Sequence, residues 1–181
     1  MVNRILIDTN VLLDYILTRE PFYEDAKRIV SACVDGKVKG CIAAHSISNM
    51  FFILRKDFNS EERREVLLNL CSIFDIEGID KIKLIAGLQN EEFSDFEDCL
   101  QMECAKSYGA GYIVTRNIDD YKVSEIKAIL PKVRDVKVKF VYGRLGSTRR
   151  CIGHQRVLFS CVLKKFSIPA AEILCSFYWY P

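Results

Sequence analysis

The chain has 181 residues, of which half are hydrophobic and 28% are charged, so it can bury a sizeable core and is too apolar to be intrinsically disordered. Its net charge is only +2, and none of its apolar runs reaches the roughly 18 to 20 residues that a membrane helix needs. The first ten residues, MVNRILIDTN, reach an Asp too early for a secretory signal, so we expect a soluble, cytoplasmic protein with reduced cysteines.

The first part of the chain alternates short apolar runs with helical patterns. Residues 4–8 form an apolar run that ends in an acid, which is typical of a buried strand, and residues 10–17 place apolar side chains at helical spacing. The next helix is predicted from near Pro21 to near Gly36, because Pro is favoured in a first helical turn. Residues 40–44 predict a second strand, and a third helix is expected to open at His45.

Two sequences resembling capping boxes mark later helices. Asn59-Ser-Glu-Glu62 predicts one helix start, and Ser94-Asp-Phe-Glu97 predicts another, for a helix that runs to about Tyr108. The other predicted elements are a strand over residues 72–76, a short helix over 80–89, and strands over 111–115 and 126–130. Because strands alternate with helices, we predict an α/β fold in which a parallel sheet is covered by helices on both faces.

The charge balance changes sign near residue 131. Residues 132–181 contain ten Lys and Arg but only two acids, whereas residues 1–131 contain 16 basic and 22 acidic residues. We therefore expect a domain over residues 1–131 and a basic, cysteine-containing C-terminal extension over 132–181, to which the sequence assigns no definite structure.

Acidic and amide side chains follow the predicted strands. Asp8 ends the first strand, and Asp95 and Asp98 share one face of a capped helix. Because parallel strands place ligands at their carboxyl ends, we expect these groups to meet at one edge of the sheet. Asp119 is expected to face solvent. The side chains expected at that edge are Asp8, Asp95, Asp98, Thr115, Arg116, Asn117 and Asp120.

Clustered carboxylates repel one another, so this edge should need a compensating cation. The two histidines, His45 and His154, are isolated, and no cysteines have zinc-finger spacing. Oxygen ligands without His or Cys favour Mg²⁺ or Mn²⁺ over zinc. Such ions neutralise phosphate charge and activate water for in-line attack on phosphorus, so the pattern favours phosphodiester chemistry.

Some of these acids also fit ordinary structural roles. Asp95 and Glu97 could be first-turn acids favoured by the helix dipole, and for Glu97 we favour that role. Asp14 is compatible both with a solvated helix surface and with a functional role. Function better explains Asp8, which ends an apolar run, and Asp98, which precedes apolar residues on its helix.

Three motifs in this order resemble PIN-domain nucleases. Residues 5–14, ILIDTNVLLD, resemble the opening of that domain, residues 94–101, SDFEDCLQ, its central acidic helix, and residues 113–121, IVTRNIDDY, its last motif. Residues 49–56, NMFFILRK, resemble the third helix of one branch of the family. The resemblance covers residues 3–131. It implies a three-layer α/β/α domain with a mainly parallel sheet of four to five strands.

The resemblance also implies a function and a set of site residues. Many family members are VapC-like toxins, which are metal-dependent endoribonucleases silenced by an antitoxin and often dimeric. Carried over, Asp8 and Asp98 match the core metal-binding acids, and Asp95 matches an additional acid. Asp95 or Asp98 would help to deprotonate the attacking water. The implied catalytic acids are Asp8, Asp95, Asp98 and Asp120, and the implied Mg²⁺ or Mn²⁺ ligands are Asp8, Asp98, Asn117 and Asp120. The supporting residues are Thr9, Asn10, Asn49 and Thr115. For such a nuclease we also expect Arg116 and Lys122 to contact RNA phosphates.

Two further hypotheses remain open. Many PIN nucleases have a Glu where this chain has Asn49, and an amide supplies no negative charge, so the chain could be a catalytically weakened module that binds RNA or protein. It could also be a haloacid-dehalogenase-type phosphatase with Asp8 as nucleophile, but that family needs an Asp two residues later, where this chain has Asn10.

Overall fold

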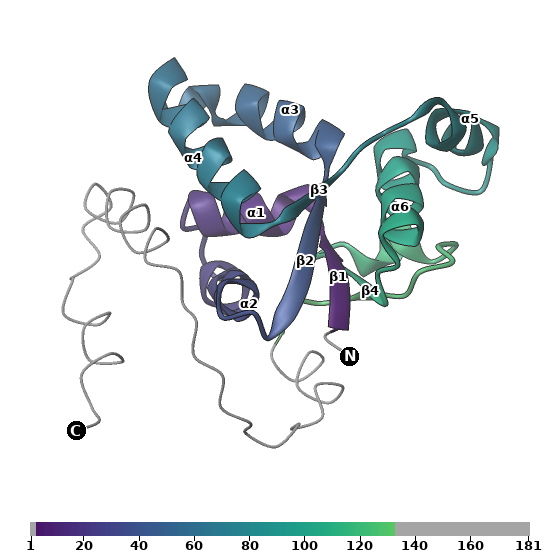
Figure 1. Cartoon of the computed structure of the whole chain (residues 1–181), viewed down its shortest axis with the longest axis horizontal. Coiled ribbons are helices and arrows are strands. Elements are labelled where there is room, and N and C mark those ends of the chain that lie inside the picture. The colour runs from purple at the N-terminus through teal and green to yellow at the C-terminus, as the bar shows by residue number, and fades with distance from the viewer. Residues whose placement is uncertain (1–2, 133–181) are drawn as a thin grey trace. The chain divides into compact units, whose positions relative to one another are not determined.

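The computed structural model describes residues 3–132 (Figure 1). Beyond Lys132, the predicted C-terminal extension lies outside the described residues. None of the helices within residues 3–132 is long and apolar enough to cross a membrane.

A five-stranded parallel sheet forms the centre of the fold, in the order β3-β2-β1-β4-β5. The first three strands in the chain extend the sheet in one direction from β1, and the last two extend it in the other. The sheet therefore has a topological switch point between β1 and β4, where ligands bind in open α/β sheets. The strands are β1 (Asn3–Ile7), β2 (Val38–Ala43), β3 (Asp75–Glu77), β4 (Tyr112–Val114) and β5 (Ala128–Ile129).

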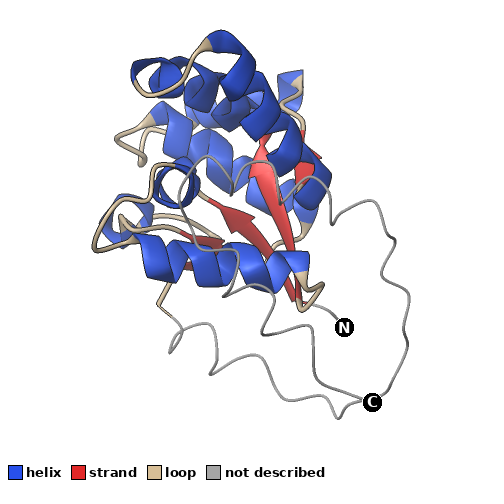
Figure 2. Ribbon diagram, turned by 90° about the vertical axis from the view of Figure 1, so that its left-hand side faces the viewer, coloured by secondary structure: helices blue, strands red, loops and turns tan. Residues whose placement is uncertain are grey.

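Helices cover both faces of this sheet, which confirms the predicted three-layer α/β/α architecture (Figure 2). Successive strand residues point to opposite faces, so Ile5 and Ile7 pack in one core with α1, α2, α3 and α4, while Leu6 packs in the other with α6. The helices are α1 (Thr9–Ile16), α2 (Tyr23–Val34), α3 (Ala44–Ile53), α4 (Ser60–Ile73), α5 (Lys81–Gln89) and α6 (Phe96–Tyr108), with short 3₁₀ helices η1 (Leu54–Lys56) and η2 (Ile118–Tyr121).

The first predicted capping box is confirmed. The Asn59 side chain accepts hydrogen bonds from the N–H groups of Glu61 and Glu62, and the Glu62 carboxylate accepts one from the Asn59 N–H. The second prediction is wrong by one residue. Asp95 rather than Ser94 caps α6, and its Oδ1 accepts the N–H groups of Glu97 and Asp98. A residue of the candidate site therefore also begins a helix.

Two predicted element starts also differ from the structure. The third strand was expected over residues 72–76, but Ser72 and Ile73 complete α4 and the strand is Asp75–Glu77. The helix persists because Phe74 donates its N–H to Leu70 and packs in the same core, one helical turn further on. Helix α2 begins at Tyr23 rather than at Pro21.

Candidate functional site

Asp8 lies at the switch point of the sheet and is almost completely buried, with 4% of its surface exposed. Its Oδ2 accepts hydrogen bonds of 2.6 Å from both Asn10 Nδ2 and Thr115 Oγ1, and its Oδ1 accepts one of 3.0 Å from Gln101 Nε2. The donors come from α1, from the residue after β4 and from α6. Three neutral donors from three segments therefore fix the orientation of this carboxylate.

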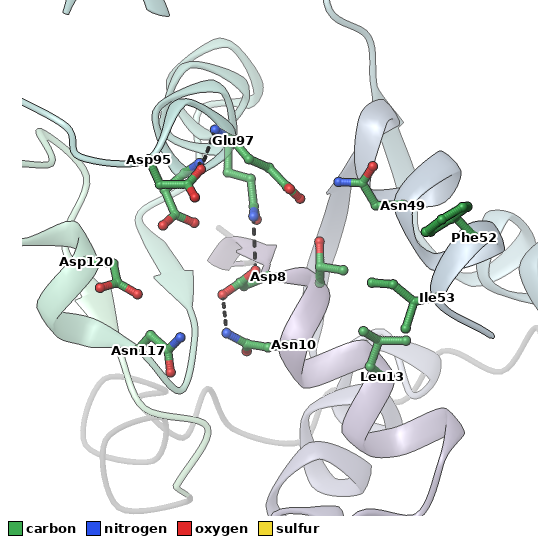
Figure 3. Close-up of a pocket in the computed structure, with 13 residues that line it drawn as sticks. Asp8, Asn10, Leu13, Asn49, Phe52, Ile53, Asp95, Glu97, Asn117 and Asp120 are labelled. Carbon is green, nitrogen blue, oxygen red and sulfur yellow. Dashed lines mark hydrogen bonds between the residues drawn. The ribbon is translucent and has the colours of Figure 1, made fainter. Parts of the chain in front are cut away.

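A cavity of about 400 Å³ opens beside Asp8 (Figure 3). Its polar wall carries Asp95 and Glu97 at the start of α6, together with Asn117 and Asp120 beside η2. The opposite wall comes from α1 and α3 and carries the apolar side chains of the lining together with Asn49. The lining residues are Asp8, Thr9, Asn10, Leu13, Asn49, Phe52, Ile53, Asp95, Glu97, Asp98, Gln101, Asn117 and Asp120. Five of these are acids, and none is Lys or Arg.

Burial and the clustered negative charge raise the pKa of an acid in the cavity. Burial and, to a lesser extent, the charges of Asp8, Asp95 and Asp120 raise the pKa of Asp98 to about 6, although a 2.9 Å hydrogen bond that Tyr121 Oη donates to Asp98 Oδ1 lowers it. These shifts indicate that the described residues leave the acidic cluster incompletely neutralised.

The side chains of Glu97 on α6 and Asn49 on α3 both line the cavity and are close enough for a hydrogen bond. Burial raises the pKa of Glu97, and a hydrogen bond with Asn49 opposes that rise. Glu97 is thus both the expected first-turn acid of α6 and part of the cavity wall. The nearby His45 Nε2 lies 3.7 Å from Glu97 Oε1, but burial lowers the pKa of His45 and favours its neutral form.

Asp14 has a buried structural role that neither expectation described. Its side chain is 1% exposed, lies outside the cavity lining, and has its Oδ2 3.1 Å from Arg116 Nε. The Arg116 guanidinium also lies 4.4 Å from the centre of the Phe22 ring. Burial raises the pKa of Asp14 although Arg116 and Arg19 lower it. This ion pair links α1 to the segment that carries Asn117.

The structure gathers most of the predicted site residues in one place. Thr115 does not line the cavity, but its hydroxyl donates a hydrogen bond to Asp8. The two predicted RNA contacts lie outside the lining: Arg116 pairs with Asp14, and Lys122 pairs on the surface with Asp119. The predicted residues that line the cavity are Asp8, Thr9, Asn10, Asn49, Asp95, Asp98, Asn117 and Asp120.

Sequence reasoning missed Gln101 and Tyr121. Gln101 donates a hydrogen bond to Asp8, and Tyr121 donates one to Asp98. Gln101 is 1% exposed, so it is a buried amide on α6. Its position one helical turn after Asp98 was the available signal, because residues three apart share a helix face. Tyr121 directly follows Asp120, and its hydroxyl donates a hydrogen bond to Asp98.

The donor chemistry of the cavity fits a hard divalent cation, because its polar groups offer carboxylate and amide oxygens rather than thiols or imidazoles. Gln101 Oε1 is also buried without a hydrogen-bond partner. Within residues 3–132, however, no three His, Cys, Asp or Glu side chains converge on a single ion position. An ion here would therefore need amide and water ligands beside its carboxylates, as Mg²⁺ commonly has.

Fold and site together define an α/β protein with an acidic cavity at the switch point of a parallel sheet. The family model of the PIN domain matches residues 4–119, so the chain belongs to the PIN domain family. No curated protein matches it.

Several solved structures share this fold. A toxin–antitoxin complex from Klebsiella pneumoniae matches with a TM-score of 0.55 and 20% identity, covering 70% of this chain and 97% of that chain. FitAcB from Neisseria gonorrhoeae matches with a TM-score of 0.55 and 15% identity over the same shares. VapBC2 from Rickettsia felis, bound to a DNA fragment from its promoter, matches with a TM-score of 0.52 and 15% identity, covering 70% of this chain and 98% of that chain.

Proposed function

We propose that this chain is a metal-dependent endoribonuclease that hydrolyses RNA phosphodiesters, and that it is the toxin of a toxin–antitoxin module. The observation that carries the proposal is the convergence of five carboxylates on one cavity at the switch point of the sheet. Membership of the PIN domain family supports a nuclease. The toxin–antitoxin complexes among the structural neighbours support an antitoxin as protein partner.

In this proposal Asp8, Asp98, Asp120 and Asn117 hold Mg²⁺ or Mn²⁺, some of them through bridging water, because no three carboxylates within residues 3–132 converge on one ion position. The bound ion supplies charge neutralisation at the phosphate and activation of water. Asp95 or Asp98 accepts the proton of the attacking water. The water oxygen bonds to phosphorus, the bond from phosphorus to the 3′ oxygen breaks, and that oxygen takes a proton from solvent. The products carry a 5′-phosphate and a 3′-hydroxyl.

Two contacts favour the nuclease over the other hypotheses. Glu97 brings a carboxyl group into hydrogen-bond contact with Asn49, so α6 places an acid beside position 49. Asn10 donates a 2.6 Å hydrogen bond to Asp8. It therefore acts as a neutral donor, where a haloacid-dehalogenase-type phosphatase needs an acid.

The test is cleavage of single-stranded RNA by the full chain in Mn²⁺, in Mg²⁺ and in EDTA. Asp8→Asn and Asp98→Asn should each reduce the rate by at least about 100-fold. Asp119→Asn is the matched control, because Asp119 is an exposed acid beside Asp120 and outside the cavity. Cleavage by Asp8→Asn at the parental rate in Mn²⁺ would refute the site. RNA binding without cleavage in either ion would instead favour the binding-module hypothesis.

The proposed function also implies a cellular location and protein partners. We propose that the chain acts in the cytoplasm, as a homodimer that an antitoxin silences. Co-expression with the product of the neighbouring open reading frame, followed by size-exclusion chromatography, tests both associations. Co-elution of the two proteins with loss of RNA cleavage is the expected result.

A further inference from the structure

One wall of the cavity carries apolar side chains beside Asn49 and faces the acids. Leu13 of α1 and Phe52 and Ile53 of α3 are these side chains, on the side away from Asp95 and Asp120 (Figure 3). Phe52 is 59% exposed. An aromatic ring therefore stands partly in solvent at the rim of a cavity whose other side is acidic. Burial in the protein core does not account for it.

Positively charged side chains accompany this ring. The guanidinium carbon of Arg55 lies 3.6 Å from the centre of the Phe52 ring, so Arg55 covers one ring face. Among residues 3–132, neither Arg55 nor Lys56 forms an ion pair with an acid, and both are exposed. Because Arg55 covers one face of the Phe52 ring, we assign the solvent-exposed surface of the ring to its opposite face and its edges.

The end of α3 that carries this pair is held in place from α4. Arg63 Nη1 donates a 2.8 Å hydrogen bond to the Phe51 carbonyl, and its guanidinium carbon lies 4.3 Å from the centre of the Phe51 ring. Phe51 itself packs against the core. Phe52, the next residue, is therefore presented from a fixed backbone and loses little freedom when a ligand stacks on it.

We propose that Phe52 stacks a base of single-stranded RNA at the mouth of the cavity, and that Arg55 and Lys56 contact the phosphates beside that base. The inference rests on the proposed function, because it takes RNA as the substrate. Exposed aromatic rings beside basic side chains bind single strands through base stacking and phosphate contacts. The acids repel phosphates, so the cations at the apolar rim are where the strand gains attraction.

This arrangement selects an unpaired strand over a duplex. In a duplex each base already stacks on its neighbours, and the base faces are covered. A single strand can turn one base onto the free face of Phe52, and the neighbouring phosphodiester is then directed to the acidic side of the cavity. Phe52 thus acts as a binding residue that sets the position of the strand.

The test measures binding separately from cleavage. A fluorescein-labelled oligoribonucleotide is titrated with the full chain in EDTA, and fluorescence anisotropy gives the Kd. Phe52→Ala and Phe52→Leu should weaken binding by roughly 5- to 150-fold, whereas Phe52→Trp should preserve it. Ile82→Ala is the matched control, because Ile82 is an apolar side chain on α5 that is 77% exposed and outside the cavity. The same RNA annealed into a duplex should bind more weakly and should not depend on Phe52.

The charge contribution has its own measurement. The plot of log K for RNA binding against log salt concentration has a negative slope. Arg55→Gln should make this slope shallower by about 0.7, the value for one phosphate contact on a single strand. Arg28→Gln, at an exposed site on α2 where Arg28 pairs with Asp25, should leave the slope unchanged.

Failure of the inference and failure of the proposed function give different results. If the parent cleaves RNA in Mn²⁺ and both Phe52→Ala and Phe52→Leu bind it with the parental Kd, the stacking inference is overturned and the nuclease stands. If binding depends on Phe52 but no ion supports cleavage, the inference holds and the nuclease fails. If these variants leave RNA affinity unchanged but alter the sedimentation coefficient, the surface joins copies of the chain, which also overturns the inference.

Discussion

Replacing Asp98 by Asn should stabilise the ion-free protein at neutral pH, although the same change should remove activity. Burial, together with the neighbouring acids, raises the pKa of Asp98 from its ordinary value of 3.8 to about 6. One pKa unit corresponds to ~1.36 kcal/mol, so ionised Asp98 destabilises the folded chain by up to about 3 kcal/mol. Solvent screening of this half-buried group reduces the expected gain from Asp98→Asn to about 1–3 kcal/mol.

The pH dependence gives this prediction its sign. In the unfolded chain Asp98 loses its proton near its ordinary pKa of 3.8, but in the folded chain it keeps the proton to about pH 6. Between these values the folded state binds more protons, so the stability of the parent should fall as pH rises from about 4 to 6. Asp98→Asn lacks this contribution. Glu97 and Asp14, whose pKa values are also raised, are present in both proteins.

The assay is thermal unfolding by circular dichroism in EDTA, at pH 4 and at pH 7.5. At pH 7.5 the Tm of Asp98→Asn should exceed that of the parent by about 2–10 °C for a chain of this size. The difference should largely disappear at pH 4. Mn²⁺ should raise the Tm of the parent more than that of the variant. Asp119→Asn, the exposed control, should stay within about 0.5 kcal/mol of the parent. A lower Tm for Asp98→Asn in EDTA at pH 7.5 would refute the reasoning.

Substitutions at three further positions test the roles of neighbouring residues separately. Arg116→Met should destabilise the chain by about 3–5 kcal/mol, measured by urea unfolding, because it leaves buried Asp14 without its nearest cation. Acidification that protonates Asp14 should reduce this loss of stability. An unchanged unfolding midpoint would contradict a stabilising role for the ion pair. Thr115→Val removes a 2.6 Å hydrogen bond to buried Asp8 and should cost about 1–3 kcal/mol in the same assay, and a neutral result would show that the bond contributes little. Asp95→Asn should keep the Tm of the parent because Asn caps a helix as well as Asp does, and it should slow cleavage if Asp95 accepts the proton of the attacking water. Asp95→Ala should in addition cost about 1 kcal/mol of stability. Equal Tm values for the two variants would argue against the cap.

The fold was predictable because its signals are local. The apolar run in residues 4–8 and the capping box at Asn59 each identify an element from a few neighbouring residues, and the structure confirms both. The prediction failed where adjacent patterns compete. Residues 72–76 are apolar enough for a strand, but Phe74 continues the helical face of Leu70, and only the tertiary core decides between these states. Ser94 and Asp95 are both good caps, and the sequence alone does not select one.

The sequence likewise predicted only part of the candidate site. Its acids could be identified because the carboxyl ends of parallel strands must meet at one edge. The partners of these and neighbouring acids were harder to assign, since Gln101 contacts Asp8 from 93 residues away and Arg116 meets Asp14, outside the cavity, from another strand end. Such pairings depend on side-chain directions that the sequence does not specify. Metal binding and the catalytic roles of these acids stay predictions.

The three neutral donors around Asp8 have a consequence for how the protein would be controlled. Many small metalloproteins are unfolded until their ion arrives, so that binding and folding are one event. Here the carboxylate at the centre of the site is already oriented by Asn10, Thr115 and Gln101. Withdrawal of the ion should therefore leave an intact, dormant protein that regains activity as soon as the ion returns, without a refolding delay.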